Sequence, residues 1–151
     1  MGVFYRGMVT LLMAGALAVQ ALSQSAPIVD MPRRVFEITG ANPRECGRHP
    51  LREVNGRREG ATREQLEASL ECARDAIKAG QPFWTFVELR GIDSWVAIGF
   101  LRTASGDVRY FGYDSNPGGG LGYSPRLTLQ PCQLPSVRPA VDGSAASFYC
   151  P

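Results

Sequence analysis

Apolar residues recur at helical spacing in the middle of the chain, at intervals of four, three and four residues, namely at Leu66, Leu70, Ala73 and Ile77. This period predicts a helix from about Arg63 to Ala79, with one face that packs on a core. Thr62 and Gln65 supply the pattern of a capping box at its start. Gly80 and Pro82 favour an end there, because glycine adopts the left-handed conformation readily and proline cannot continue the helix.

The spacing changes to that of strands after this helix. Three segments rich in aromatic and β-branched residues follow one another, at Phe83–Arg90, Trp95–Arg102 and Asp107–Tyr113. Their short connections predict antiparallel neighbours, because a parallel crossover needs about a dozen residues. A fourth strand is expected over Arg126–Gln130, and a short edge strand over Ser147–Cys150.

The chain begins with the pattern of a secretory signal. Arg6 precedes an apolar run over Met8–Leu22, and small residues near the end of that run suit cleavage before Gln24. The run contains Gln20 and is shorter than the roughly 20 residues of a spanning helix, which favours cleavage over a retained anchor. We therefore expect residues 1–23 to be removed and the mature protein to be extracytoplasmic, periplasmic or secreted, without stable membrane insertion.

Residues 24–61 are rich in proline and glycine and predict an irregular N-terminal segment. Only Arg34–Thr39 alternates well enough to suggest a short strand, at a sheet edge or outside the sheet. Six arginines lie between positions 44 and 63, but glutamates are interleaved with them, so a solvated loop is the preferred interpretation. We expect this segment to form one domain with the helix and sheet of residues 62–151.

Charge excludes one class of partner. Removal of Arg6 lowers the formal net charge from +2 to +1. A nearly neutral chain exerts no general attraction on nucleic acid or on an anionic membrane. We therefore expect no nucleic-acid partner.

The four cysteines allow three pairings, between which the sequence alone does not choose. We prefer Cys46–Cys72 and Cys132–Cys150, because each bond would fix an irregular segment to a regular one. No Cys-x-x-Cys pair is present, which argues against thiol redox catalysis or a zinc ribbon. The expected fold is therefore α+β: one helix packed on an antiparallel meander of about four strands, with two disulfides and with the terminal segments covering part of the other sheet face.

Residues typical of catalysis are sparse. His49 is the single histidine and lies in a segment expected to be an exposed loop. The glycines of 118–120 precede a strand rather than a helix, so they lack the helix N-terminus that binds phosphate. Asp93, Asp107 and Asp114 lie at strand ends and support a minority hypothesis of carboxylate-based hydrolysis, such as glycosidase chemistry.

Aromatic residues are the other candidate functional set, and they lie on or beside the expected sheet at Trp84, Trp95, Tyr110, Phe111, Tyr113 and Tyr123. The preferred interpretation is packing in the core and across strands. Trp95 is the expected exception, because it opens a strand directly after polar residues. An aromatic side chain there can contact a peptide, a sugar or a protein.

Hairpin register predicts one specific site. The dipeptide Asp-Ser occurs at Asp93-Ser94 and at Asp114-Ser115, on either side of one hairpin. A two-residue loop at Ala104-Ser105, or a three-residue loop with a left-handed Gly106, brings both dipeptides to one end of the sheet. The candidate binding residues are Asp93, Ser94, Trp95, Asp114, Ser115 and Asn116.

These oxygen-bearing groups could bind a cation such as calcium or form a polar recognition patch. The preferred interpretation is simpler: each Asp and Ser bonds to the backbone of its own turn.

As a whole, the sequence favours an exported, disulfide-stabilised binding module without catalytic activity, whose partner is an extracytoplasmic protein or glycan. A small carboxylate-based hydrolase and a structural envelope-associated protein are the alternatives.

Overall fold

A computed structural model describes residues 30–120, 124–140 and 145–151. The elements in chain order are α1 (Asp30–Thr39), β1 (Arg44–His49), β2 (Arg52–Val54), β3 (Arg57–Glu59), α2 (Arg63–Lys78), β4 (Phe83–Arg90), β5 (Trp95–Arg102), β6 (Val108–Asp114), β7 (Arg126–Pro131), β8 (Ser136–Arg138) and β9 (Ser147–Tyr149). The expected signal peptide and Gln24 lie outside the described residues.

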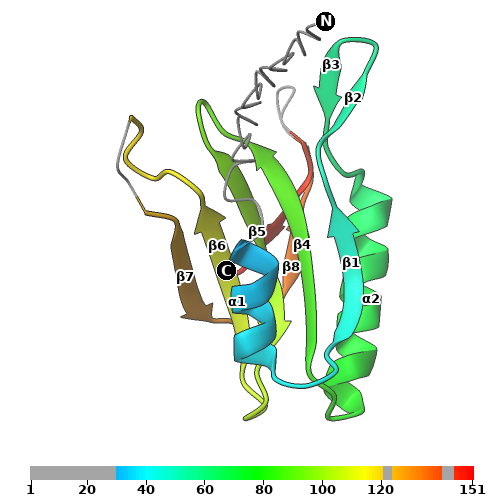
Figure 1. Ribbon diagram of the computed structural model, residues 1–151. Helices are drawn as coiled ribbons and strands as arrows, with labels where there is room; N and C mark the ends of the chain where they lie inside the picture. Colours follow the sequence, from blue (N-terminus) through cyan, green and yellow to red (C-terminus); the bar gives the residue numbers. More distant parts are fainter. Residues whose placement is uncertain (1–29, 121–123, 141–144) are drawn as a thin grey trace, which may run out of the picture.

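The sheet confirms the predicted antiparallel meander and extends it by one strand. Its order is β1-β4-β5-β6-β7, with antiparallel pairing from β4 to β7. β1 lies parallel to β4 at one edge, and α2 is the crossover between them. The predicted last strand is present as β9, but it pairs with β8 in a small separate sheet. The fold is thus α+β, with a mostly antiparallel five-stranded sheet (Figure 1).

Helix α2 begins and ends as its sequence predicts. Thr62 and Gln65 form the capping box in both directions. At the other end the amide of Gln81 donates to the carbonyl of Ala76 over 2.8 Å, and Gly80 has φ +68°. This is the Schellman arrangement, in which a left-handed glycine satisfies the last carbonyls. The buried residues of the helix are Leu66, Ser69, Leu70, Ala73 and Ala76.

The strand suggested at Arg34–Thr39 is wrong, because these residues form most of helix α1. Met31, Val35 and Ile38 recur at intervals of four and three residues, and the first two are each 1% exposed. This helical spacing reaches back beyond the segment in which alternation suggested a strand. Gly40, at φ +82°, ends the helix and donates to the carbonyl of Phe36 over 2.9 Å.

The described residues form two helices rather than the expected one, and α1 and α2 cover opposite faces of the sheet (Figure 1). Alternate residues of β4 divide between the two cores, with Phe83 and Val87 on the α2 side and Trp84 and Phe86 on the α1 side. This alternation is the period of a strand with both faces buried.

The arginine-rich segment expected to be a loop is instead strand β1 and the β2–β3 hairpin. β1 buries Cys46, and Asn55 and Gly56 join β2 to β3 with φ of +51° and +73°. Two successive left-handed residues make the type I′ turn that suits a tight hairpin. The expectation of solvent exposure holds for β2 and β3, all of whose residues are exposed.

Both disulfides have the preferred pairing. Cys46–Cys72 joins β1 to α2, and Cys132–Cys150 joins the end of β7 to the end of β9. Their Cα–Cα distances are 5.4 and 5.9 Å. No described helix is both long and apolar enough to cross a membrane.

Candidate functional site

The β5–β6 hairpin brings the two Asp-Ser dipeptides to the same end of the sheet. Thr103 donates its amide to the carbonyl of Asp107 over 2.9 Å, and Gly106 lies at φ +100°. This is the predicted three-residue loop with a left-handed glycine, and it pairs Val96 with Asp114. We refer to the end formed by residues 91–95 and 114–120 as the loop end.

Asp114 bonds to the backbone of its own turn, as the simpler interpretation predicts, whereas Ser115 bonds across the hairpin to Trp95. An Asp114 carboxylate oxygen accepts from the amide of Asn116 over 2.9 Å. Trp95 and Ser115 are joined twice, because the Ser115 amide donates to the Trp95 carbonyl and the Trp95 amide donates to the Ser115 hydroxyl, over 2.9 and 2.8 Å. These bonds fix the position of Trp95.

Asp93 is placed differently, with its carboxylate against the glycine-rich loop. A Cβ built on Gly119, which has φ +65°, would lie 3.0 Å from a carboxylate oxygen of Asp93. The loop is closed by Asn116, whose side-chain amide donates to the carbonyl of Gly120 over 3.2 Å. The side-chain oxygen of Asn116 is buried and has no hydrogen-bond partner in the part of the chain that the structure describes. Asp93 itself is exposed, which leaves its carboxylate accessible.

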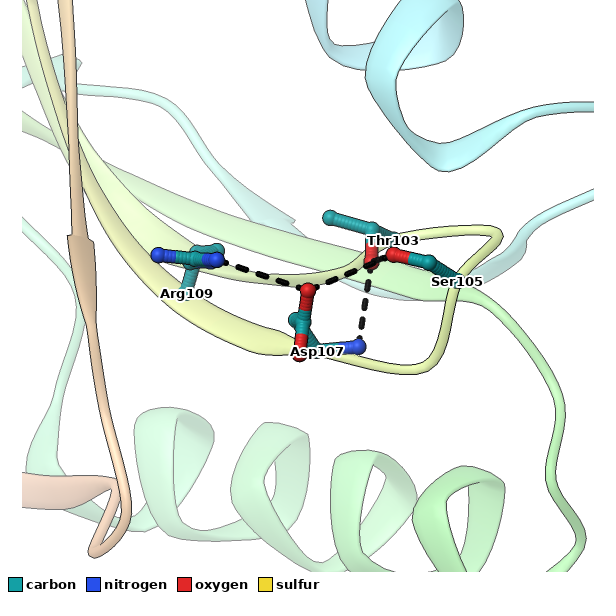
Figure 2. A network of polar contacts seen from close by, with 4 residues as sticks. All are labelled: Thr103, Ser105, Asp107 and Arg109. Atoms are coloured by element: carbon teal, nitrogen blue, oxygen red, sulfur yellow. Dashed lines mark hydrogen bonds and ion pairs between the residues drawn. The ribbon is translucent and has the colours of Figure 1, made fainter.

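Asp107 does not join the other two carboxylates. It lies in the turn between β5 and β6, at the opposite end of the sheet from Asp93 and Asp114. Its carboxylate contacts Ser105 and Arg109, as Figure 2 shows. Its amide donates to the Thr103 hydroxyl over 3.0 Å. These contacts order the turn.

Over the described ranges, no group of three or more His, Cys, Asp or Glu side chains could hold a metal ion.

Packing is confirmed as the role of most aromatic residues of the sheet. Trp84, Phe111 and Tyr113 are at most 2% exposed. Tyr123 lies outside the described residues. Trp95 is only half-buried, and its ring packs on Tyr113 and Phe86 at centroid distances of 5.1 and 6.3 Å. Trp95 is therefore a rigid aromatic side chain that is supported from beneath and partly open to solvent.

The sequence predicted that His49 lies in an exposed loop, but it lies in β1 and its side chain is hydrogen-bonded to Ser69 of α2. Its Nε2 lies 2.7 Å from the hydroxyl of Ser69. Burial, and then the positive charge of Arg52, lower the pKa of His49. A neutral histidine beside a serine is the arrangement of a nucleophile and its base.

The surroundings of this pair argue against nucleophilic catalysis. Ser69 is 4% exposed, and a cavity of about 210 Å³ beside the pair is lined by His49 but not by Ser69. The Ser69 hydroxyl thus does not line this cavity. The hydroxyl also bonds to the carbonyl of Gln65 over 3.2 Å, so its contacts hold the imidazole in place.

Sequence reasoning missed this pair because its members are distant in sequence and the lone histidine follows a glycine-containing segment typical of loops. The chain matches no family model, no curated protein and no solved structure.

Proposed function

We propose that this chain is an exported binding module that recognises an extracytoplasmic protein through the loop end. One observation carries the proposal: Trp95 is half-buried, its backbone is held by two hydrogen bonds to Ser115, and its ring packs on Tyr113 and Phe86. The exposed carboxylate of Asp93 lies two positions before it in the chain. A preorganised aromatic side chain beside polar groups is typical of the residues that contribute most to protein interfaces.

The chemistry of the module fits binding better than turnover. Asp107 lies at the opposite end of the sheet from Asp93 and Asp114, and an Asp114 carboxylate oxygen accepts from the amide of Asn116, which favours binding over carboxylate-based hydrolysis. The two disulfides suit an oxidising compartment, which supports export. A binding module of this kind needs a stable scaffold and a few fixed contact residues, without a nucleophile.

Site-specific photo-crosslinking in the producing cells tests the proposal. A photoreactive amino acid at position 95 should capture a defined protein, whereas the same group at Gln130, exposed on β7 near the opposite end, should not. Mass spectrometry of the captured chain should show an N-terminus near Gln24. Equal capture at both positions would contradict a specific interface, and an N-terminus at Met1 would contradict signal cleavage.

The purified partner then allows a quantitative test. Asp93→Ala should weaken binding about fivefold or more and leave the melting temperature nearly unchanged, because the side chain is exposed. Asp75→Ala removes a carboxylate that is 61% exposed on α2 and serves as the matched control. Unchanged affinity in both Asp93→Ala and Trp95→Ala would rule out the loop end as the binding surface.

A further inference from the structure

A second hollow lies beside the loop end, between the tip of the β2–β3 hairpin and the turn that joins β4 to β5. Its volume is about 930 Å³, and its lining residues are Gly56, Arg57, Arg58, Arg90, Gly91 and Ile92. This volume is in the range of ligand-binding pockets in proteins, roughly 300–1,000 Å³. We call this hollow the arginine cleft.

The three arginines of the cleft have no ion-pair partner among the described residues. Arginines elsewhere do have such partners, for example Arg63 with Glu67 and Arg109 with Asp107. Arg58 stands opposite Glu53 in the hairpin register, but the two side chains form no ion pair. Three guanidinium groups therefore remain available to an anionic ligand at one cleft.

Both walls of the cleft are tight turns. The hairpin tip has two left-handed residues, Asn55 and Gly56. On the other wall, a Cβ at Gly91 would collide with the carbonyl oxygen of Ser94, so the backbone of this turn is closely packed on itself. Turns of this kind hold their flanking residues in place, which lowers the entropic cost of binding.

Ile92 adds an apolar group to the rim. It is fully exposed, with a relative exposure of 104%, and lines the same hollow as Arg90, two positions earlier in the chain. An exposed aliphatic side chain next to guanidinium groups fits a ligand that carries both carboxylates and an apolar side chain. Planar guanidinium groups bind carboxylates through paired hydrogen bonds.

We propose that the arginine cleft binds an acidic peptide segment of the partner protein, with Asp or Glu side chains on the arginines and an aliphatic side chain on Ile92. The identity of the ligand as part of a protein partner rests on the proposed function. Glutamates on the same hairpin and the low net charge of the chain favour this local contact over the extended basic surface that nucleic acid requires.

A synthetic peptide of alternating Glu and Leu residues tests the cleft directly, by fluorescence anisotropy with the full mature protein. The variant Arg57→Gln/Arg58→Gln/Arg90→Gln should weaken binding about tenfold or more. The control Arg44→Gln/Arg74→Gln/Arg138→Gln removes the same charge from exposed positions outside the cleft and should change affinity less than about twofold. Ile92→Ser should weaken binding several-fold, because its side chain contributes only the apolar contact.

Further probes separate the acidic peptide from other anions. A peptide with Gln in place of Glu should not bind, and equal binding by it would overturn the proposal. Equal weakening by the two arginine variants would also overturn it, as would stronger binding to inorganic phosphate or to phosphatidylglycerol vesicles than to the acidic peptide. If the peptide fails to bind while position 95 still captures a partner, the arginine cleft is excluded and the proposed function stands.

Discussion

Gly47 is the residue that allows β1 and α2 to approach each other. The register of β1 against β4 shifts between Glu45 and Arg48, and Gly47 lies in this irregularity with φ +143°. A Cβ there would collide with the Ser69 hydroxyl and would lie 2.8 Å from Nε2 of His49. The hydrogen bond between His49 and Ser69 therefore requires glycine at position 47, two positions before the histidine. The composition of the segment indicated a turn, and the actual use of the glycine follows only from the packing of two distant elements.

The same pair predicts a pH dependence of stability. Burial and Arg52 lower the pKa of His49 in the folded protein, whereas an unfolded histidine titrates near pH 6.5. The unfolded state therefore binds the proton more readily, and protonation favours unfolding. The contribution of His49 to the free energy of unfolding is fully present above about pH 6.5. It is lost as the pH falls from there through the pKa of His49 in the folded protein.

Chemical denaturation at several pH values between 5 and 8 measures this contribution. The difference in unfolding free energy between the wild type and His49→Gln, which has no titrating ring, should decrease as the pH falls below about 6.5. A difference that is independent of pH, or an imidazole pKa above its ordinary value in an NMR titration, would contradict the assignment.

Helix α2 and the meander are the elements that local sequence specifies best. The helix carries its own caps, and each strand of the meander is joined to the next by a short turn. β1 was not predicted because its signal is not local, and α1 was not predicted because its local signal is short. β1 is held by pairing with a strand beyond α2, and only Met31, Val35 and Ile38 mark the apolar face of α1.

The packing of α2 predicts a large effect for one substitution. Leu70 is 3% exposed within the core on the α2 side. Leu70→Ala should lower the unfolding free energy by about 2–5 kcal/mol, because it leaves a cavity between helix and sheet. Leu129→Ala, at a position that is 41% exposed on β7, is the control and should cost much less. Equal effects in equilibrium denaturation would mean that α2 does not cover the sheet in this way.

At the scale of the whole molecule, the fold class could be predicted, and so could the meeting of the Asp-Ser dipeptides at one sheet end. The sequence alone left three disulfide pairings open, and the preferred one is present. The arginine cleft could not be predicted. It combines a hairpin that composition suggested to be a loop with a turn more than thirty residues later. Their approach depends on the parallel pairing of β1 with β4, which no short-range pattern specifies.

The two disulfides predict similar contributions to global stability. Their sequence separations are 26 and 18 residues. The chain-entropy model gives about 3 kcal/mol for each bond and a difference of only about 0.3 kcal/mol between them. Denaturation of Cys46→Ser/Cys72→Ser and Cys132→Ser/Cys150→Ser should therefore show comparable losses of about 2–4 kcal/mol. A loss below about 0.5 kcal/mol for either pair would show that its bond does not restrain the unfolded chain.

The parallel pairing of β1 with β4 also sets an order of events in folding. Arg44 meets Phe83 across the whole length of α2, whereas the β4–β7 hairpins close between near neighbours. Contacts between near neighbours form first, because closing a long loop costs more conformational entropy, and this cost comes before the contacts that stabilise the closed loop. β1 then docks last, and Cys46 reaches Cys72 only at that step. We therefore expect a folding stage in which the meander is formed while the thiols of Cys46 and Cys72 are still reduced, and this is the form that an oxidising enzyme would meet if the chain is exported as proposed.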